Sequence, residues 1–282
     1  MSITPDTSVA LLLQKIPRLQ GNWMIVADEN WYAVNWSTLS GSDGITPLIF
    51  SNRIDIAEAA QTAGLACTFN DFDFSSLQQQ SLDGILYRVS KERATSHHVI
   101  NCAQTLLKPN AKLLLSGQKN DGIKTYAKQA GQLFDDSFSV EKNGNAYTAC
   151  IQLNKLDGYP LDDKDYPQLR PVHTKANLTF QSKPGIFGWN KIDQGSAFLI
   201  EHLPTFIESF GKETSAQSLL DLGCGYGYLA CAASPLGFHK ITATDNNAAA
   251  LNACRENFAA LDIDGEVIAG DAGSQINKRF DA

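Results

Sequence analysis

The chain has 282 residues, of which 43% are hydrophobic and 19% are charged, an ordinary composition for a water-soluble protein with about two domains. No run of about 18 uncharged apolar residues is present, which argues against a membrane span. The formal net charge is −7, and this counts against a protein that grips nucleic acid mainly through its phosphates.

Two further features of the sequence predict a reduced, cytoplasmic protein. The N-terminus lacks the basic stretch that precedes the apolar run of a signal peptide. The six cysteines are scattered and contain no CxxC pair, which favours free thiols over a disulfide frame or a zinc site. We therefore expect no metal site, no membrane association and a cytoplasmic monomer.

The first half of the chain alternates predicted strands with predicted helices. Helical periodicity covers three segments, 55–64, 91–107 and 122–134. Strands are predicted at 23–28, 47–52, 65–71, 84–90, 112–118, 138–142 and 146–153. The alternation predicts an α/β fold with a parallel, doubly wound sheet. The last two strands form a hairpin, for which Asn143-Gly144 suits a type I′ turn.

A change of composition separates the two halves. Residues 154–185 contain four prolines and many polar residues, which is typical of a linker with short extended pieces. We therefore expect an N-terminal domain at 1–155, a linker at 156–184 and a C-terminal domain at 185–282. Basic and acidic residues number 13 and 14 in residues 1–155, and 10 and 16 in residues 156–282.

A second alternation fills the C-terminal half. A helix at 192–210 is expected to be interrupted at Pro204, because proline lacks the amide that a helix interior needs. Strands follow at 218–223, 240–245 and 265–271, with helices beginning at 227 and 247. The sequence therefore predicts a second α/β domain.

The first strand of this second domain leads into three alternating glycines. Residues 219–230 read LLDLGCGYGYLA, so that Asp221 is followed by Gly223, Gly225 and Gly227 and then by a helix. Glycines let the backbone approach a ligand closely, and the helix offers free amides. Asp245 closes the next strand, where it could accept both hydroxyls of a ribose. This geometry is typical of sites for dinucleotides and for S-adenosylmethionine.

Three features favour S-adenosylmethionine. The dinucleotide pattern would need a glycine at Tyr228. An acid at the turn, Asp221, would repel a pyrophosphate but suits a ligand with a cationic amino group and a sulfonium. Asp271 ends the third strand, where it could hold an adenine amino group, and Ala272 beside it leaves room for the ring.

The motifs in this half resemble a known family. DLGCGYG, TATDNN and IAGDAGS are similar to motifs I, II and III of class I methyltransferases, and residues 183–200 resemble the lead-in of the small-domain methyltransferases. That family includes ribosomal RNA small-subunit methyltransferase C, a guanine-N2 methyltransferase. The resemblance implies S-adenosylmethionine as cofactor, 16S ribosomal RNA or the small subunit as partner, and cofactor-binding roles for Asp221, Gly223, Gly225, Gly227, Asp245, Asn246, Asp271 and Ala272.

Residues 1–155 resemble a second, degenerate methyltransferase fold. Residues 106–134 are similar to the late strand and helix of such a domain, yet no glycine occurs from Asn22 to Ser40, where the turn would lie. We expect two tandem Rossmann-like folds, the N-terminal one unable to bind the cofactor in the usual way. The resemblance implies that this domain positions the substrate or acts as a chaperone and is not itself a catalyst.

The resemblance also implies a catalytic motif that residues 1–282 do not contain. RFDA at the end of the sequence resembles the start of the fourth strand, which in the family precedes Asn-Pro-Pro-aromatic. We therefore expect the C-terminal fold to be truncated here, the catalytic residues to lie beyond Ala282, and the 282-residue form to transfer no methyl groups. The open alternatives are a small-molecule or protein methyltransferase, and a non-catalytic module that keeps the fold.

One histidine pair is a candidate ligand site. His97 and His98 lie within the predicted helix at 91–107. Because neighbouring side chains on a helix diverge by about 100°, they cannot both face one ligand. We expect them at the surface or at its boundary.

Overall fold

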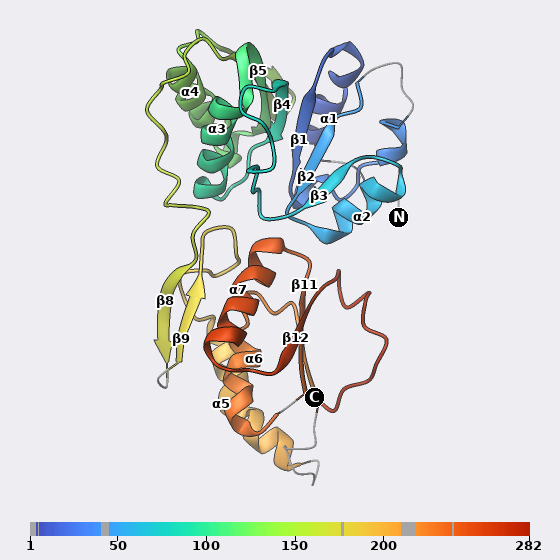
Figure 1. Cartoon of the computed structure of the whole chain (residues 1–282), viewed down its shortest axis with the longest axis vertical. Helices are drawn as coiled ribbons and strands as arrows, with labels where there is room; N and C mark the ends of the chain where they lie inside the picture. The colour runs from blue at the N-terminus through green and yellow to red at the C-terminus, as the bar shows by residue number, and fades with distance from the viewer. Residues whose placement is uncertain (1–3, 5, 41–44, 176–177, 210–217, 239) are drawn as a thin grey trace. The chain divides into compact units, whose positions relative to one another are not determined.

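The computed structural model describes residues 4, 6–40, 45–175, 178–209, 218–238 and 240–282. The chain divides into two compact units, Met1–Tyr166 and Pro167–Ala282, drawn in blue to yellow-green and in yellow to red (Figure 1). Each unit is an α/β fold, as the sequence predicts. Among the described residues no helix combines the length and the apolar character needed to cross a bilayer.

The N-terminal unit is built on a seven-stranded sheet with the strand order β3-β2-β1-β4-β5-β7-β6. The pairs β1–β2, β2–β3, β1–β4 and β4–β5 are parallel, whereas β7 runs antiparallel to both β5 and β6. Its strands are β1 (Trp23–Ala27), β2 (Leu48–Ser51), β3 (Cys67–Phe69), β4 (Leu82–Arg88), β5 (Leu107–Gln118), β6 (Ser139–Asn143) and β7 (Ala146–Gln152). From β1 the sheet grows toward β3 on one side and toward β5 on the other, so the strand order reverses between β1 and β4. Such a reversal is a topological switch point, where open α/β sheets bind ligands.

Helices cover both faces of this sheet. The core on one face contains residues of α3 (Arg93–Leu106) and α4 (Ile123–Phe134), and the core on the other contains residues of α1 (Thr7–Leu13) and α2 (Ile54–Thr62). Helix α1 was not predicted from the sequence. It begins at Asp6, whose carboxylate accepts the amides of Ser8 and Val9, and such capping stabilises a helix this short.

The predicted hairpin at the end of the sheet forms, but its turn differs from the prediction. Asn143 pairs with Ala146, so the two turn residues are Gly144 and Asn145. Only Gly144 has a positive φ, of 63°, whereas a type I′ turn at Asn143-Gly144 would need a positive φ at both residues.

The predicted linker is in large part ordered. Residues up to Tyr166 pack on the N-terminal unit, where the Tyr166 side chain is fully buried. In the C-terminal unit, β8 (Arg170–Lys175) and β9 (Leu178–Ser182) form an antiparallel hairpin. The four prolines, which are spread over residues 160–184, explain why the sequence resembled a linker throughout.

The C-terminal unit has a parallel sheet in the order β10-β11-β12, with β10 (Ser218–Leu222), β11 (Lys240–Asp245) and β12 (Gly265–Ala269). Its helices are α5 (Gln194–Glu208), α6 (Tyr228–Ala233) and α7 (Ala248–Ala260). The backbone of Ala282 accepts the amide of Leu220 and donates to Ser218. The predicted start of a fourth strand therefore lies alongside β10.

Helix α5 continues through Pro204, contrary to the predicted interruption. Pro204 is exposed, so the carbonyl that loses its helical partner one turn earlier can be solvated by water. A proline on the solvent side of a helix thus costs one hydrogen bond without ending the helix.

The prediction for the histidine pair was wrong in burial. His97 and His98 are both buried. Their rings point to different partners, as the helix geometry requires: His97 contacts Gln129 and the Asp162 carbonyl, and His98 contacts the Phe72 carbonyl. Segments far away in the sequence cover this face of α3, and local periodicity does not reveal them.

Candidate cofactor site

The glycine turn, residues 223–227, joins β10 to α6. Its three glycines have φ values of 78°, 55° and 85° for Gly223, Gly225 and Gly227, in the left-handed region that residues with a Cβ avoid. The amides of Gly223 and Cys224 both donate to the carbonyl of Thr244, at 2.8 and 3.0 Å. The start of the turn is thereby attached to β11.

The three glycines have different roles in this geometry. A Cβ added to Gly223 or Gly225 would meet nothing within 4 Å, whereas one added to Gly227 would lie 2.8 Å from the sulfur of Cys254. Gly223 and Gly225 therefore border open space that a ligand can enter. Gly227 instead permits the close packing of α6 on α7.

Asp245 lies at the end of β11 and is held across the turn. Its Oδ2 accepts the amide of Gly225 at 3.0 Å, and its Oδ1 accepts the amide of Asn247 at 2.9 Å. Each carboxylate oxygen can accept more than one hydrogen bond. The side chain is therefore fixed in position and retains acceptor capacity for two hydroxyl groups.

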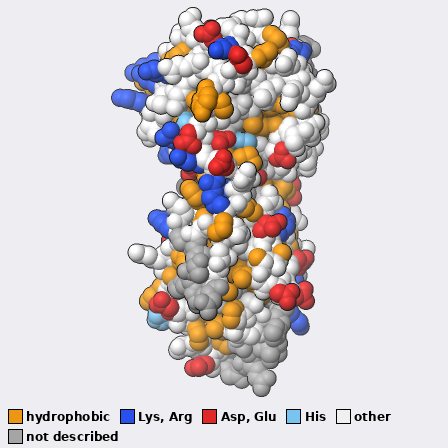
Figure 2. Space-filling model, turned by 60° about the vertical axis from the view of Figure 1, so that its left-hand side comes forward, with side chains coloured by type: hydrophobic (Ala, Val, Ile, Leu, Met, Phe, Trp, Pro, Cys, Tyr) orange, Lys and Arg blue, Asp and Glu red, His pale blue; other side chains and the backbone are white. Residues whose placement is uncertain are grey.

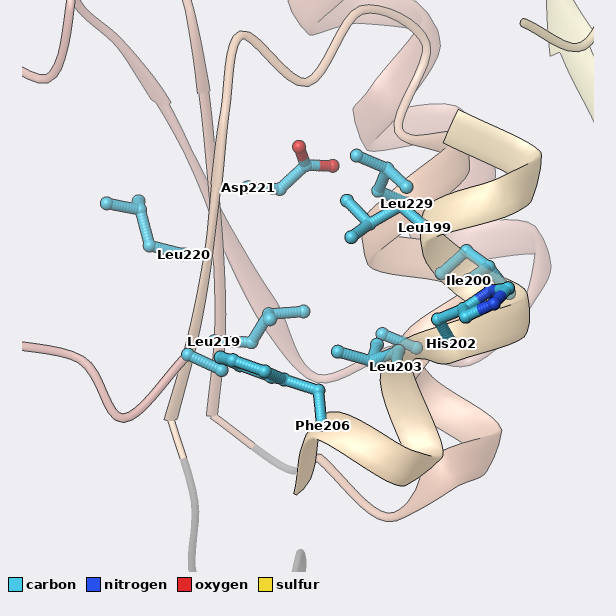
Figure 3. Close-up of a pocket in the computed structure, with 11 residues that line it drawn as sticks. Leu199, Ile200, His202, Leu203, Phe206, Leu219, Leu220, Asp221 and Leu229 are labelled. Carbon is cyan, nitrogen blue, oxygen red and sulfur yellow. The ribbon is translucent and has the colours of Figure 1, made fainter. Parts of the chain in front are cut away.

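Asp221 is buried below the turn, with 5% of its surface exposed. Its Oδ2 accepts the amide of Ala230 in α6 at 3.1 Å, and Figure 3 shows the carboxylate extending from β10 toward the helices that carry Leu199 and Leu229. Burial, with a contribution from the charge of Asp245, raises the pKa of Asp221 from 3.8 to about 6. Asp221 thus supports the turn from behind and is a less exposed charge than the sequence suggested.

Asp271 and Asn246 are joined at the ends of neighbouring strands. Asn246 donates its side-chain amide to Asp271 Oδ1 at 3.0 Å, which orients the exposed carboxylate that follows β12. Ala272 has a φ of 46°, a conformation that a residue with a Cβ adopts at some cost. The small side chain of Ala272 keeps the space beside Asp271 open.

One residue that sequence reasoning missed positions the turn. Asn257 of α7 is fully buried and donates to the carbonyl of Tyr226 at 2.7 Å, while it exchanges two hydrogen bonds with the backbone of Gln181 in β9. An asparagine in a polar helix pattern reads as a surface residue, so nothing in the local sequence marks this role.

A separate apolar pocket of about 360 Å³ lies behind β10 (Figure 3). Residues of α5, α6 and β10 line it, and Asp221 is the acid among them. None of the three glycines, Asp245 or Asp271 lines it. The apolar surroundings account for the raised pKa of Asp221, and Asp221 is the one predicted cofactor-site residue that the described lining includes.

Comparison with known proteins confirms the resemblance inferred from the motifs. Residues 177–282 match the family described as the methyltransferase small domain. The chain is 28% identical over 249 residues to ribosomal RNA small subunit methyltransferase C of Shewanella loihica, over 80% of this chain and 68% of that protein. It is 27% identical over 209 residues to the protein of the same name from Shewanella piezotolerans, over 72% of this chain and 57% of that protein.

Among solved structures, the fold is similar to that of the T. thermophilus 16S rRNA N2 G1207 methyltransferase in complex with AdoMet and guanosine. The TM-score is 0.81 at 20% sequence identity, over 98% of this chain and 72% of that chain. The likeness extends through both units, so the tandem α/β architecture is shared. The chain spans between about half and two thirds of the length of the curated relatives it matches.

Proposed function

We propose that this protein is a class I methyltransferase that uses S-adenosylmethionine to methylate the N2 atom of a guanine in 16S ribosomal RNA. The match of residues 177–282 to the methyltransferase small domain supports the activity. The names of the relatives, ribosomal RNA small subunit methyltransferase C, support the substrate.

The observation that carries the proposal is the arrangement of open backbone and carboxylates at the ends of three parallel strands. Open space lies above Gly223 and Gly225, and the Asp245 carboxylate is held directly beside it. Acceptors suit the hydroxyls and amino groups of an adenosine, and the acids suit a cation, whereas a pyrophosphate would be repelled. The residues present therefore fit S-adenosylmethionine.

Each residue has a proposed task. When bound, the cofactor supplies an electrophilic methyl group on a sulfonium. Asp245 accepts hydrogen bonds from the ribose hydroxyls. Asp271, whose carboxylate is oriented by Asn246, accepts a hydrogen bond from the adenine amino group, and Ala272 leaves room for the adenine ring. The glycine turn lets the backbone lie close to the ligand, and Asp221 holds α6 beneath the turn and contributes negative charge. We assign no catalytic residue within 1–282, and these residues contribute to the reaction by binding and orienting the cofactor.

The partner and setting are part of the same proposal: ribosomal RNA or the small subunit as substrate, a monomeric enzyme, and the cytoplasm as its location. One observation favours a different substrate class. Basic and acidic side chains are interspersed on the face shown in Figure 2, and residues 156–282 carry more acids than bases. A small-molecule or protein methyltransferase, or a binding module that keeps the fold, would fit that charge distribution.

The test uses the full product of the gene that encodes this sequence. Tritiated methyl transfer is measured onto small ribosomal subunits that lack the modification, and in parallel onto protein and metabolite extracts. Transfer to the 16S RNA, with label at guanine N2, is the expected result. Label only in protein or metabolites would support another methyltransferase, and cofactor binding without transfer to any substrate would support a binding module.

A further inference from the structure

The end of the N-terminal unit folds back over α3. We call residues 156–166 the strap. Asn101 of α3 donates to the carbonyl of Leu161 and accepts its amide, both at 2.8 Å, and His97 Nδ1 lies 2.7 Å from the carbonyl of Asp162. At Gly158 an added Cβ would collide with the carbonyl of Leu133. The strap is therefore seated by specific contacts along its length.

Tyr166, the last residue of the strap, inserts a fully buried ring into the N-terminal unit. The ring stacks on His98, with centroids 4.6 Å apart and planes 25° from parallel, and the hydroxyl donates to Asp71 Oδ1 at 2.7 Å. Burial and the neighbouring Asp71 charge raise the pKa of Tyr166, so the hydroxyl remains a donor. Asp71 follows β3, so the ring sits at the carboxyl ends of the parallel strands.

The two units can be aligned through their own hydrogen bonds. After β3, the amide of Asn70 donates to the carbonyl of Ser51 at 3.0 Å; after β12, the amide of Gly270 donates to the carbonyl of Asp245 at 3.0 Å. Ser51 thus corresponds to Asp245, and Asn70 corresponds to Gly270.

Side-chain contacts support the same alignment. Ser51 Oγ accepts the amide of Arg53 two residues ahead at 3.1 Å, as Asp245 Oδ1 accepts the amide of Asn247 at 2.9 Å. The next helix begins three residues after each, at Ile54 in α2 and at Ala248 in α7. One residue beyond Asn70 and Gly270, Asp71 therefore corresponds to Asp271.

The same alignment shows what the N-terminal unit has lost. Val26 pairs with Phe50 in β2, and Leu222 pairs with Thr244 in β11, so residues 27–31 stand where the glycine turn stands in the C-terminal unit. The last three of them, Glu29–Trp31, form a short 3-10 helix that ends in the fully buried Trp31. The serine at position 51 offers no carboxylate for a ribose. Of the three cofactor-site acids, only the one after the third strand has a counterpart, and the fully buried Phe72 stands at the position of Ala272.

We infer that the N-terminal unit retains the purine position of an adenosine site, and that Tyr166 fills this position from within the chain. The inference rests on the proposed function, which gives Asp271 the adenine amino group as its partner. Tyr166 presents an aromatic ring and one hydroxyl that donates a hydrogen bond to Asp71. Adenine would present the same two features to this carboxylate, an aromatic ring and an amino group that donates. The ligand class that the site takes when Tyr166 is removed is a free purine or its nucleoside.

The experiment titrates adenosine into the 282-residue chain and follows the ring signals of His98 by NMR. In wild type these signals should not respond. In Tyr166→Ala they should shift saturably with a dissociation constant in the millimolar range, on the order of 1 mM, because one ring and one hydrogen bond support only weak binding. The double variant Tyr166→Ala, Asp71→Ala should bind at least about tenfold more weakly, since charge-assisted hydrogen bonds are worth more than about 1.4 kcal/mol.

Two results would overturn the inference. One is the absence of any His98 response in a folded Tyr166→Ala variant up to about 10 mM adenosine, well above the weak binding expected. The other is an equal response in wild type. If Tyr166→Ala does not fold, Asn101→Ala removes the two strap hydrogen bonds and keeps the tyrosine. Adenosine should then shift the His98 signals with a dissociation constant above about 1 mM, because Tyr166 still competes for the position, and no response there would equally overturn the inference.

The same titration separates this inference from the proposed function. Backbone signals of Asp271 report the C-terminal site independently of His98. The proposed function would be contradicted if the His98 signals respond to adenosine while the Asp271 signals respond neither to adenosine nor to S-adenosylmethionine. A response at Asp271 alone would leave the proposed function standing and remove the purine site of the N-terminal unit.

Discussion

Replacing Asp221 with asparagine should stabilise the C-terminal unit at neutral pH. The Asp221 carboxylate is buried among apolar residues, and among the described contacts one backbone amide, that of Ala230, donates to it. Asparagine has the same shape, keeps an oxygen for that amide, and carries no charge. The change therefore removes the cost of ionising a carboxyl in this environment.

The size of the effect follows from the pKa. A carboxyl whose pKa rises from 3.8 to about 6 on folding destabilises the fold by about 3 kcal/mol once it is ionised, since each pKa unit is worth about 1.4 kcal/mol. The amide NH₂ of asparagine loses its hydrogen bonds to water in this apolar pocket, which costs about 1–3 kcal/mol. The net gain expected above pH 6 is therefore up to about 2 kcal/mol.

The sign of the pH dependence is the sharper test. Because the folded-state pKa is raised, the contribution of Asp221 to stability is most favourable below about pH 4, where Asp221 is protonated in both states, and this contribution is lost as the pH rises to about 6. The advantage of Asp221→Asn should thus grow by about 1.4 kcal/mol for each pH unit over this interval and then level off. Hydrogen exchange of buried β11 amides measures the stability of this unit separately. Asp264→Asn, at an exposed position, is the control. A stability difference that stays constant from pH 4 to pH 8 would refute the reasoning.

Three further predictions concern the site and the strap. Asp245→Ala should weaken S-adenosylmethionine binding by about 1–3 kcal/mol in calorimetry, the range for lost charge-assisted hydrogen bonds; Asp264→Ala should not, and equal affinities would contradict the ribose role. Gly227→Ala should lower stability by at least about 2 kcal/mol in urea unfolding, because of its positive φ and the contact with a cysteine of α7, both costly; a midpoint like that of wild type would argue against it. The fragment 1–155 should fold and show no thermal shift with S-adenosylmethionine. The fragment 1–166 should be about 3 kcal/mol more stable than 1–155, since it keeps the fully buried ring of Tyr166. Identical urea midpoints for the two fragments would show that the strap contributes nothing to stability.

The local features of the cofactor site could be predicted from the amino-acid sequence. The three glycines adopt backbone conformations that other residues avoid, and their spacing in residues 223–227 predicts the turn. The acids that end successive strands could be placed at one edge of the sheet, because parallel strands bring their carboxyl ends together. The same logic predicted both α/β units and the closing hairpin, since strand and helix periodicities are properties of short segments.

Which side chains are buried, and what they face, depends on the packing of elements that are distant in the sequence. His97, His98 and Asn257 read as polar positions on helices, yet segments distant in the sequence cover them. The sequence placed Asp221 on the ligand, but packing of α6 encloses it and raises its pKa.

The strap is the clearest example of this limit. Its single proline and its acids resemble a solvated linker, and only the fold brings Tyr166 to Asp71, 95 residues earlier in the chain. Contacts of that kind depend on how whole elements pack, and no window of neighbouring residues contains the information.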